Sequence, residues 1–134
     1  MYDMKALYEA TSVENAIELR LEHPEAQIIA GGTDVLVQMR EGKRAGKELI
    51  SIQALDEIRG ICLDENEAIR IGSLTTFSHI THNPIIQKYI NVLGEAVDMV
   101  GGPQIRNAGT IGGNIWVTED VAPNARIVQS KARK

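Results

Sequence analysis

The sequence contains a single cysteine, Cys62, among its 134 residues. One thiol cannot close a disulfide within the chain, and it cannot supply the several thiolates of a structural zinc site or an iron–sulfur cluster. We therefore expect no metal site in this chain. Any redox chemistry would have to come from a bound organic cofactor or from a partner protein.

Long apolar runs and an excess of positive charge are also missing. No apolar run approaches the ~20 residues that a membrane span needs, and the N-terminus lacks the basic-then-apolar order of a secretory signal. A net charge of −4 argues against nucleic acid as a partner. We expect a cytoplasmic protein that does not contact membranes, and its apolar share of 43% suits a globular core.

The first half of the chain alternates apolar runs with helical patterns. Thr11 and Glu14 have the spacing of a capping box, and the apolar residues that follow them share one helical face: Val13, Ala16, Ile17 and Leu21. The pattern predicts strands over 5–9, 26–30 and 47–52, and helices over 11–24 and 34–42.

The second half begins with a predicted hairpin, in which 59–63 and 68–72 flank the turn-prone "DENE". Helical segments follow, one of them capped by Asn83 with Pro84 at its first position. The stretch 101–115 then breaks the regular pattern with five glycines and a proline. We expect an α+β fold of two lobes, divided as 1–55, 56–115 and a divergent basic tail over 116–134.

A Gly-Gly-Thr sequence, Gly31 to Thr33, separates a predicted strand from a predicted helix. Amide groups at such a turn point outward, and glycine lets an anion approach them closely. The sequence matches neither the P-loop nor the Rossmann fingerprint. We assign Asp34 to the helix N-terminus, where its charge is favourable. The alternative is a tight turn that uses glycine only for a positive φ.

A second Gly-Gly pair lies beside Thr110 in "AGTIGGN". Two such loops in one small chain suggest two walls around one pyrophosphate, as in a dinucleotide. Arg106 could be a charge partner of that group, although a surface ion pair is its commoner role. His79 and His82 are interpreted as exposed helix residues because no third metal ligand stands near them in the sequence. Cys62 is interpreted as a small core residue.

These loops and their surroundings resemble the FAD-binding subunits of molybdenum-containing hydroxylases of the xanthine dehydrogenase type. The matching strings are "IIAGGTDVLVQMREG", "LISIQALDEIRGI", "IRIGSLTTFSHI" and "GPQIRNAGTIGGNI". The resemblance implies an FAD-binding domain of the vanillyl-alcohol oxidase (PCMH) type, shared with murein reductase, in which two α/β lobes hold an extended FAD between them.

The resemblance also implies the site residues and the partners. The first phosphate-binding segment would be Gln27, Ile28, Ile29, Ala30, Gly31, Gly32, Thr33 and Asp34, and the second Gly109, Thr110, Ile111, Gly112 and Gly113 with Asn114 adjoining. Electrons would pass from a molybdenum-cofactor subunit through a [2Fe–2S] subunit to FAD and on to NAD. No catalytic side chain of this chain is implied.

The resemblance ends at about Ile115, after which "WVTEDVAPNARIVQSKARK" replaces the family's usual cysteine-containing, small-residue continuation. The second lobe is therefore expected to be incomplete and the chain inactive alone. The alternative hypothesis is a remnant that binds no flavin and retains at most a surface for contact with other subunits.

Overall fold

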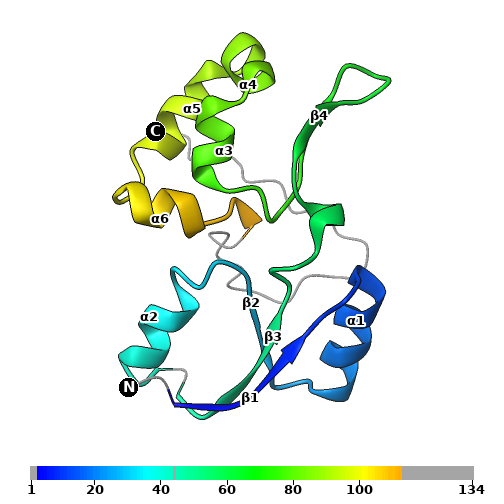
Figure 1. The fold of residues 1–134 in the computed structure, drawn as a ribbon, viewed down its shortest axis with the longest axis vertical. Coiled ribbons are helices and arrows are strands. Elements are labelled where there is room, and N and C mark those ends of the chain that lie inside the picture. The colour runs from blue at the N-terminus through cyan, green and yellow to red at the C-terminus, as the bar shows by residue number, and fades with distance from the viewer. Residues whose placement is uncertain (1–2, 44, 113–134) are drawn as a thin grey trace, which may run out of the picture.

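The computed structural model describes residues 3–43 and 45–112, and these form two lobes stacked along the long axis of the molecule (Figure 1). The first lobe holds a three-stranded sheet with one helix on either side. Its elements are β1 (Met4–Glu9), α1 (Val13–Glu22), β2 (Gln27–Ile29), α2 (Val35–Arg40) and β3 (Lys47–Ser51).

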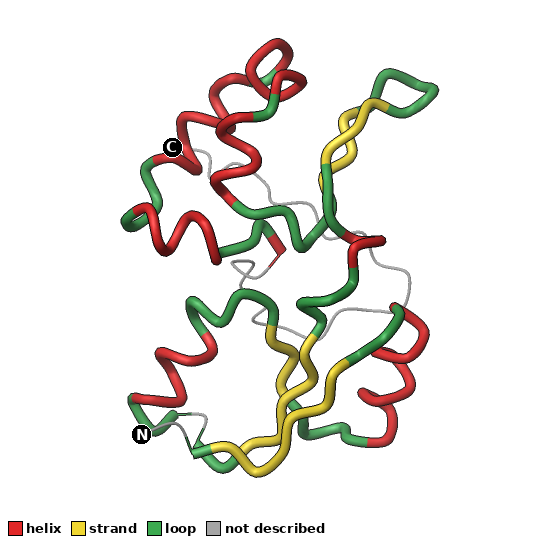
Figure 2. Tube along the Cα trace, viewed as in Figure 1, coloured by secondary structure: helices red, strands yellow, loops and turns green. Residues whose placement is uncertain are grey.

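The sheet of the first lobe is parallel, with β3 in the centre of the order β1-β3-β2 (Figure 2). Successive side chains of β3 point to opposite faces. Ile50 packs with residues of α1, and Leu49 packs with Met39 of α2. Both faces of the sheet are therefore covered, and the carboxyl ends of β2 and β3 point towards the second lobe.

Helix α1 begins one residue later than the capping box predicted. Ser12 is the N-cap, and its hydroxyl accepts the Asn15 N–H, while the Asn15 side chain accepts the Thr11 N–H at 3.0 Å. The predicted apolar face is also only partly correct. Ile17 and Leu21 are 55% and 75% exposed, because they line an open groove beside edge strand β2 instead of packing under the helix.

The second lobe joins an antiparallel hairpin to a set of short helices. Its elements are the 3₁₀ turn η1 (Asp56–Ile58), β4 (Ile61–Leu63), β5 (Ile69–Ile71), α3 (Phe77–His82), α4 (Pro84–Tyr89), α5 (Asn91–Asp98) and α6 (Pro103–Ala108). The predicted cap of α4 is confirmed, since Asn83 caps this helix with Pro84 in its first turn, and Thr76 caps α3 in the same way. Phe77, Ile80, Ile86 and Val97 form the core.

Two predictions for this lobe are wrong. The glycine-rich stretch is not irregular throughout, because Pro103 opens the six-residue helix α6, which packs against α3. Cys62 is exposed rather than part of the core. In the hairpin it stands opposite Arg70, on the face turned away from Ile61 and Ile71, which pack on the helices.

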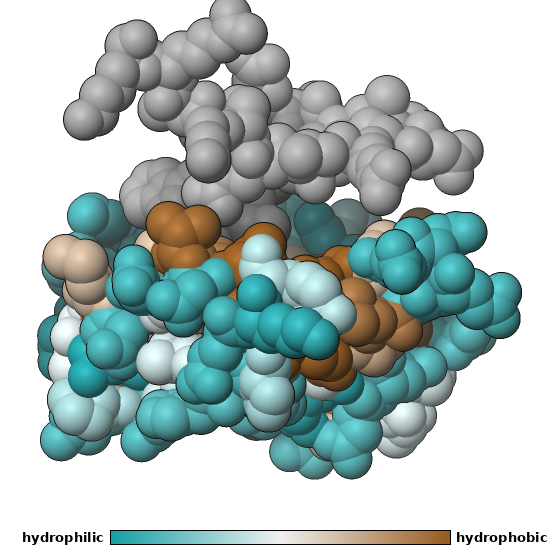
Figure 3. Space-filling model, turned by 90° about the horizontal axis from the view of Figure 1, so that it is seen from above, coloured by the Kyte–Doolittle hydropathy of each residue, from teal (hydrophilic) through white to brown (hydrophobic). Residues whose placement is uncertain are grey.

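Apolar side chains also reach the surface of the second lobe, and Figure 3 shows brown residues gathered among teal ones on the face seen from above. The most exposed large apolar residues here are Tyr89 on α4, Val92 on α5 and Met99 directly after α5, at 53%, 69% and 85%. None of the helices in the described part of the chain has the length and apolar composition of a membrane span.

The elements of the two lobes together form the two-lobed α+β architecture expected from the sequence.

Candidate functional site

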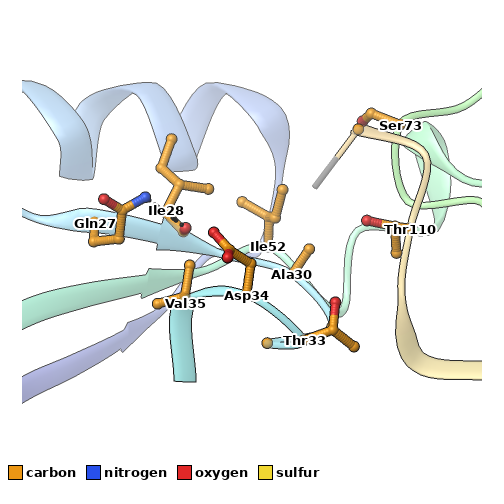
Figure 4. Close-up of a pocket in the computed structure, with 12 residues that line it drawn as sticks. Gln27, Ile28, Ala30, Thr33, Asp34, Val35, Ile52, Ser73 and Thr110 are labelled. Atoms are coloured by element: carbon orange, nitrogen blue, oxygen red, sulfur yellow. Dashed lines mark hydrogen bonds between the residues drawn. The ribbon is translucent and has the colours of Figure 1, made fainter. Parts of the chain in front are cut away.

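A cavity of about 290 Å³ opens where the two lobes meet (Figure 4). The first lobe contributes the end of β2, the loop to α2 and the residue after β3, and the second lobe contributes two separate segments. The lining residues are Gln27, Ile28, Ala30, Gly31, Gly32, Thr33, Asp34, Val35, Ile52, Ser73, Thr110 and Gly112. The volume lies near the lower end of the ~300–1,000 Å³ typical of small-molecule sites, so it suits part of a large cofactor.

The first glycine loop turns the chain from β2 into α2. Gly32 has a φ of +77°, a left-handed conformation that glycine adopts without strain. Its carbonyl accepts the Leu36 N–H at 3.1 Å, which starts the helix. The N–H groups of Gly32, Thr33 and Asp34 have no acceptor among the described residues. They are available to an anion at this end of the cavity.

Gly31 joins this loop to the second lobe. A Cβ atom built on Gly31 would lie 1.8 Å from the carbonyl oxygen of Ala108 and 3.5 Å from the backbone nitrogen of Gly109. The end of α6 therefore approaches the first loop more closely than any side chain at Gly31 would allow. Absence of a side chain here sets the separation of the two walls of the cavity.

The second glycine loop is held by a short ladder of backbone hydrogen bonds to the segment before α3. The Ile111 N–H donates to the Thr75 carbonyl at 3.0 Å, and the Gly112 N–H donates to the Ser73 carbonyl at 2.9 Å. Thr76 and Thr110 pair as an antiparallel bridge. Thr75 is fully buried, and its hydroxyl bonds to Gly60. The loop is thus anchored to the lobe rather than free to move.

Asp34 occupies the N-cap position of α2, as predicted, but its side chain makes no capping bond. The Gln38 side chain, one turn along the helix, donates to its Oδ2 atom at 2.8 Å. Asp34 nevertheless lines the cavity, and none of the described lining residues is lysine, arginine or histidine. Within this described lining, amides and hydroxyls are the groups that could hold an anion.

The structure gathers nine of the predicted site residues around the cavity, from Gln27 to Asp34 except Ile29, and Thr110 with Gly112. The side chain of Ile29 packs beneath α2, and Ile111 packs on the core of the second lobe. Gly109 lies against Phe77 and Ile105, beside the cavity rather than in its wall. Gly113 and Asn114 lie outside the described residues.

Sequence reasoning missed three residues of the wall, Val35, Ile52 and Ser73. Arg106, weighed as a charge partner, instead donates to the carbonyl of Gly101 at 2.8 Å and lies 3.7 Å from Asp98. Within residues 3–43 and 45–112, no group of three potential ligands for a metal ion is found. His79 and His82 are exposed on α3, as interpreted from the sequence.

The donors of this cavity suit a phosphate group. The hydrogen-bond donors are amide N–H groups of the first loop and the hydroxyls of Thr33 and Ser73, and the glycines add no side chains that would block a ligand from reaching them.

Comparison with known proteins identifies the family: residues 2–130 match the FAD-binding domain in molybdopterin dehydrogenase. The chain belongs to this family. FAD is therefore the cofactor of the fold, and the resemblance seen in the sequence is confirmed.

Individual relatives agree with this assignment. The chain is 40% identical to the xanthine dehydrogenase FAD-binding subunit of Escherichia coli O157:H7, over 86% of its own length and 39% of that protein. It is 43% identical to the nicotinate dehydrogenase FAD-subunit of Eubacterium barkeri, over 66% of its length and 29% of that protein.

A solved structure gives the same result for the fold. The carbon monoxide dehydrogenase of Hydrogenophaga pseudoflava, which lacks the Mo-pyranopterin moiety, superposes with a TM-score of 0.80 at 32% identity. The match covers 84% of this chain and 39% of that chain. The chain thus spans between 29% and 39% of the length of these relatives, and the two-lobed FAD-binding fold is confirmed over that part.

Proposed function

We propose that this chain binds FAD with the pyrophosphate seated between the two glycine loops. The observation that carries the proposal is the cavity in which Gly31–Asp34 of one lobe and Thr110 and Gly112 of the other meet. The binding residues we propose are Gln27, Ile28, Ile29, Ala30, Gly31, Gly32, Thr33, Asp34, Gly109, Thr110, Ile111, Gly112, Gly113 and Asn114. Ile29, Gly109 and Ile111 would act by shaping the loops.

In this proposal the N–H groups of Gly32 and Thr33 and the Thr33 hydroxyl donate to phosphate oxygens. The apolar side chains of Ile28 and Ile52 would exclude water from one side of the cofactor. When bound, FAD supplies the redox chemistry, receiving electrons from iron–sulfur clusters and passing them to NAD. No proton transfer by a side chain of this chain is required.

The partners follow from the same proposal. A [2Fe–2S] subunit would deliver electrons, and a molybdenum-cofactor subunit would carry out the hydroxylation. Relatives that work on xanthine, nicotinate and carbon monoxide share this flavin domain, which supports a substrate site on another subunit. The chain would therefore act as the flavin part of a complex and would not turn over substrate alone.

A second candidate function is subunit contact without flavin binding. Exposed apolar side chains at the two ends of α5 favour it, since Val92 lies in the first turn of the helix and Met99 directly follows its last residue. Contiguous exposed apolar surface commonly marks a protein interface. This function needs no cofactor, so FAD binding distinguishes it from the first.

The test is titration of the purified chain with FAD, followed by flavin fluorescence, in the parent and in two variants at one position. Thr33→Glu places a carboxylate on the cavity wall, while Thr33→Gln is similar in size and uncharged. At ~4 Å and an effective dielectric constant near ~20, a carboxylate and a phosphate charge repel by ~4 kcal/mol, or roughly a thousandfold in Kd.

We expect saturable binding by the parent, weaker binding by Thr33→Gln and none measurable by Thr33→Glu. Equal affinities of the two variants would show that no phosphate lies near Thr33. No saturable binding by the folded parent would leave the chain with the contact function alone.

A further inference from the structure

We propose that Ser73 is an additional cofactor-binding residue, whose hydroxyl donates to a phosphate oxygen of FAD. This inference rests on the proposed function and goes beyond it, because Ser73 lies in neither glycine loop. It belongs to the turn between β5 and α3, almost forty residues before the second loop.

Ser73 lies in the cavity wall beside the second glycine loop. It lines the same cavity as Thr33 and Thr110, and Figure 4 shows Ser73 and Thr110 together on the side of the second lobe, across from Ile28 and Ile52. The Ser73 carbonyl accepts the Gly112 N–H at 2.9 Å. A phosphate that contacts the second glycine loop therefore comes within reach of the Ser73 side chain.

The contact between Ser73 and Gly112 is unusually close. A Cβ atom built on Gly112 would lie 2.6 Å from Cβ of Ser73. Glycine at 112 thus leaves room for the serine side chain itself, which occupies the edge of the loop. This arrangement adds a side-chain hydroxyl beside a loop whose Ile111 and Gly112 N–H groups already donate to the carbonyls of Thr75 and Ser73.

The Ser73 hydroxyl has no hydrogen-bond partner among the described residues, and the residue is exposed towards the cavity and solvent. Other hydroxyls of this lobe are used internally: the Thr75 hydroxyl bonds to Gly60, and the Ser78 hydroxyl donates to Asn107. Ser73 therefore keeps its donor available for a ligand.

The charge of the cavity gives the hydroxyl its importance. Asp34 is the one charged residue in the described lining, and it is negative. Without a cationic side chain in that lining, neutral donors must stabilise the phosphates, and hydrogen bonds to a charged group are roughly twice as strong as neutral ones. Removal of one such donor should weaken binding by ~10- to 100-fold.

The experiment compares Ser73→Ala, Ser73→Thr and the control Ser78→Ala in the full chain, with FAD, ADP and riboflavin as separate ligands. ADP carries the pyrophosphate without the flavin, and riboflavin carries the flavin without the phosphates. FAD and riboflavin are followed by flavin fluorescence and ADP by calorimetry. Thermal melting of each variant checks that the fold is kept.

We expect Ser73→Ala to weaken the binding of FAD and of ADP by the same factor. The affinities of Ser73→Thr should stay near those of the parent because this variant keeps the hydroxyl. Ser78→Ala should bind both ligands as the parent does. The inference is overturned if the parent binds FAD and the Kd of Ser73→Ala for FAD is within twofold of the parent's. It is also overturned if Ser73→Ala weakens the binding of riboflavin and leaves that of ADP unchanged. A parent that binds no FAD would refute the proposed function, and the role of Ser73 with it.

Discussion

Replacement of Gly31 by alanine should separate the two walls of the cavity. The added Cβ would meet the Ala108 carbonyl oxygen at 1.8 Å, and real Cβ atoms essentially never approach another heavy atom closer than 3.0 Å. The distance between residue 31 and the end of α6 must therefore increase by about 1.2 Å. The obstacle is backbone at the end of α6, which cannot rotate away as a side chain would. The lobes or the loop must therefore move.

The expected loss follows from hydrogen-bond geometry. A ligand bond of ~2.9 Å to either loop would lengthen to ~4 Å, beyond the range of a hydrogen bond. Loss of one bond to a charged phosphate corresponds to ~1.5–3 kcal/mol, or ~10- to 100-fold in Kd for FAD. Overpacking of the contact between residue 31 and the end of α6 should also lower the free energy of unfolding by ~1–3 kcal/mol.

Flavin fluorescence titration and urea unfolding measure the two effects, with Gly102→Ala as the matched control. Gly102 has an ordinary backbone conformation, and a Cβ there would meet only the end of the Gln104 side chain, at 3.5 Å. A folded Gly31→Ala variant with the parent's affinity for FAD would refute the idea that this glycine sets the spacing of the loops.

The described cavity wall has no lysine or arginine, so raising salt from ~50 to ~500 mM should change the Kd for FAD by less than ~threefold, and a steep dependence in the titration would contradict this. The N–H of Ala68 and the side chain of Arg70 hold the pKa of the Asp64 carboxyl below its ordinary 3.8, and such a group stabilises the fold above its unfolded pKa and ceases to do so as the pH falls through the folded value. Asp64→Asn should therefore lower the melting temperature at neutral pH, with a difference from the parent that disappears on acidification, and a constant difference would be inconsistent with this. Cys62 is exposed, so an alkylating reagent should modify it in the folded chain at a rate within ~tenfold of that in urea, whereas protection would show it to be covered.

The sequence predicted what depends on local chemistry. Asn83 and Pro84 start α4 as expected, because a side-chain acceptor and a fixed φ act over only a few residues. The first glycine loop is recognised for a similarly local reason, because two glycines between a strand and a helix leave amides open, and Gly32 also has the positive φ of the alternative interpretation as a tight turn. Recognition of the family then placed these loops in an FAD-binding fold.

What depends on tertiary contact was not predicted. Ser73 and Ile52 reach the cavity only because the lobes bring their segments together. Cys62 looked like a core residue within an apolar run, but the hairpin has one packed and one exposed face, and pairing with Arg70 decides which face it takes. The division of the chain at residue 55, the status of 116–134 and the cytoplasmic location stay predictions.

The contact between Gly31 and Ala108 joins a loop of the first lobe to a residue near the end of the described chain. During synthesis the first loop leaves the ribosome long before α6 exists, so the early lobe can display its amides but cannot enclose a cofactor. Flavin capture would then come late and cooperatively, and ligand added at ~100 times its Kd would stabilise the joined state by ~2.7 kcal/mol. Cofactor loading would thus serve as a check that both lobes have been made and correctly joined.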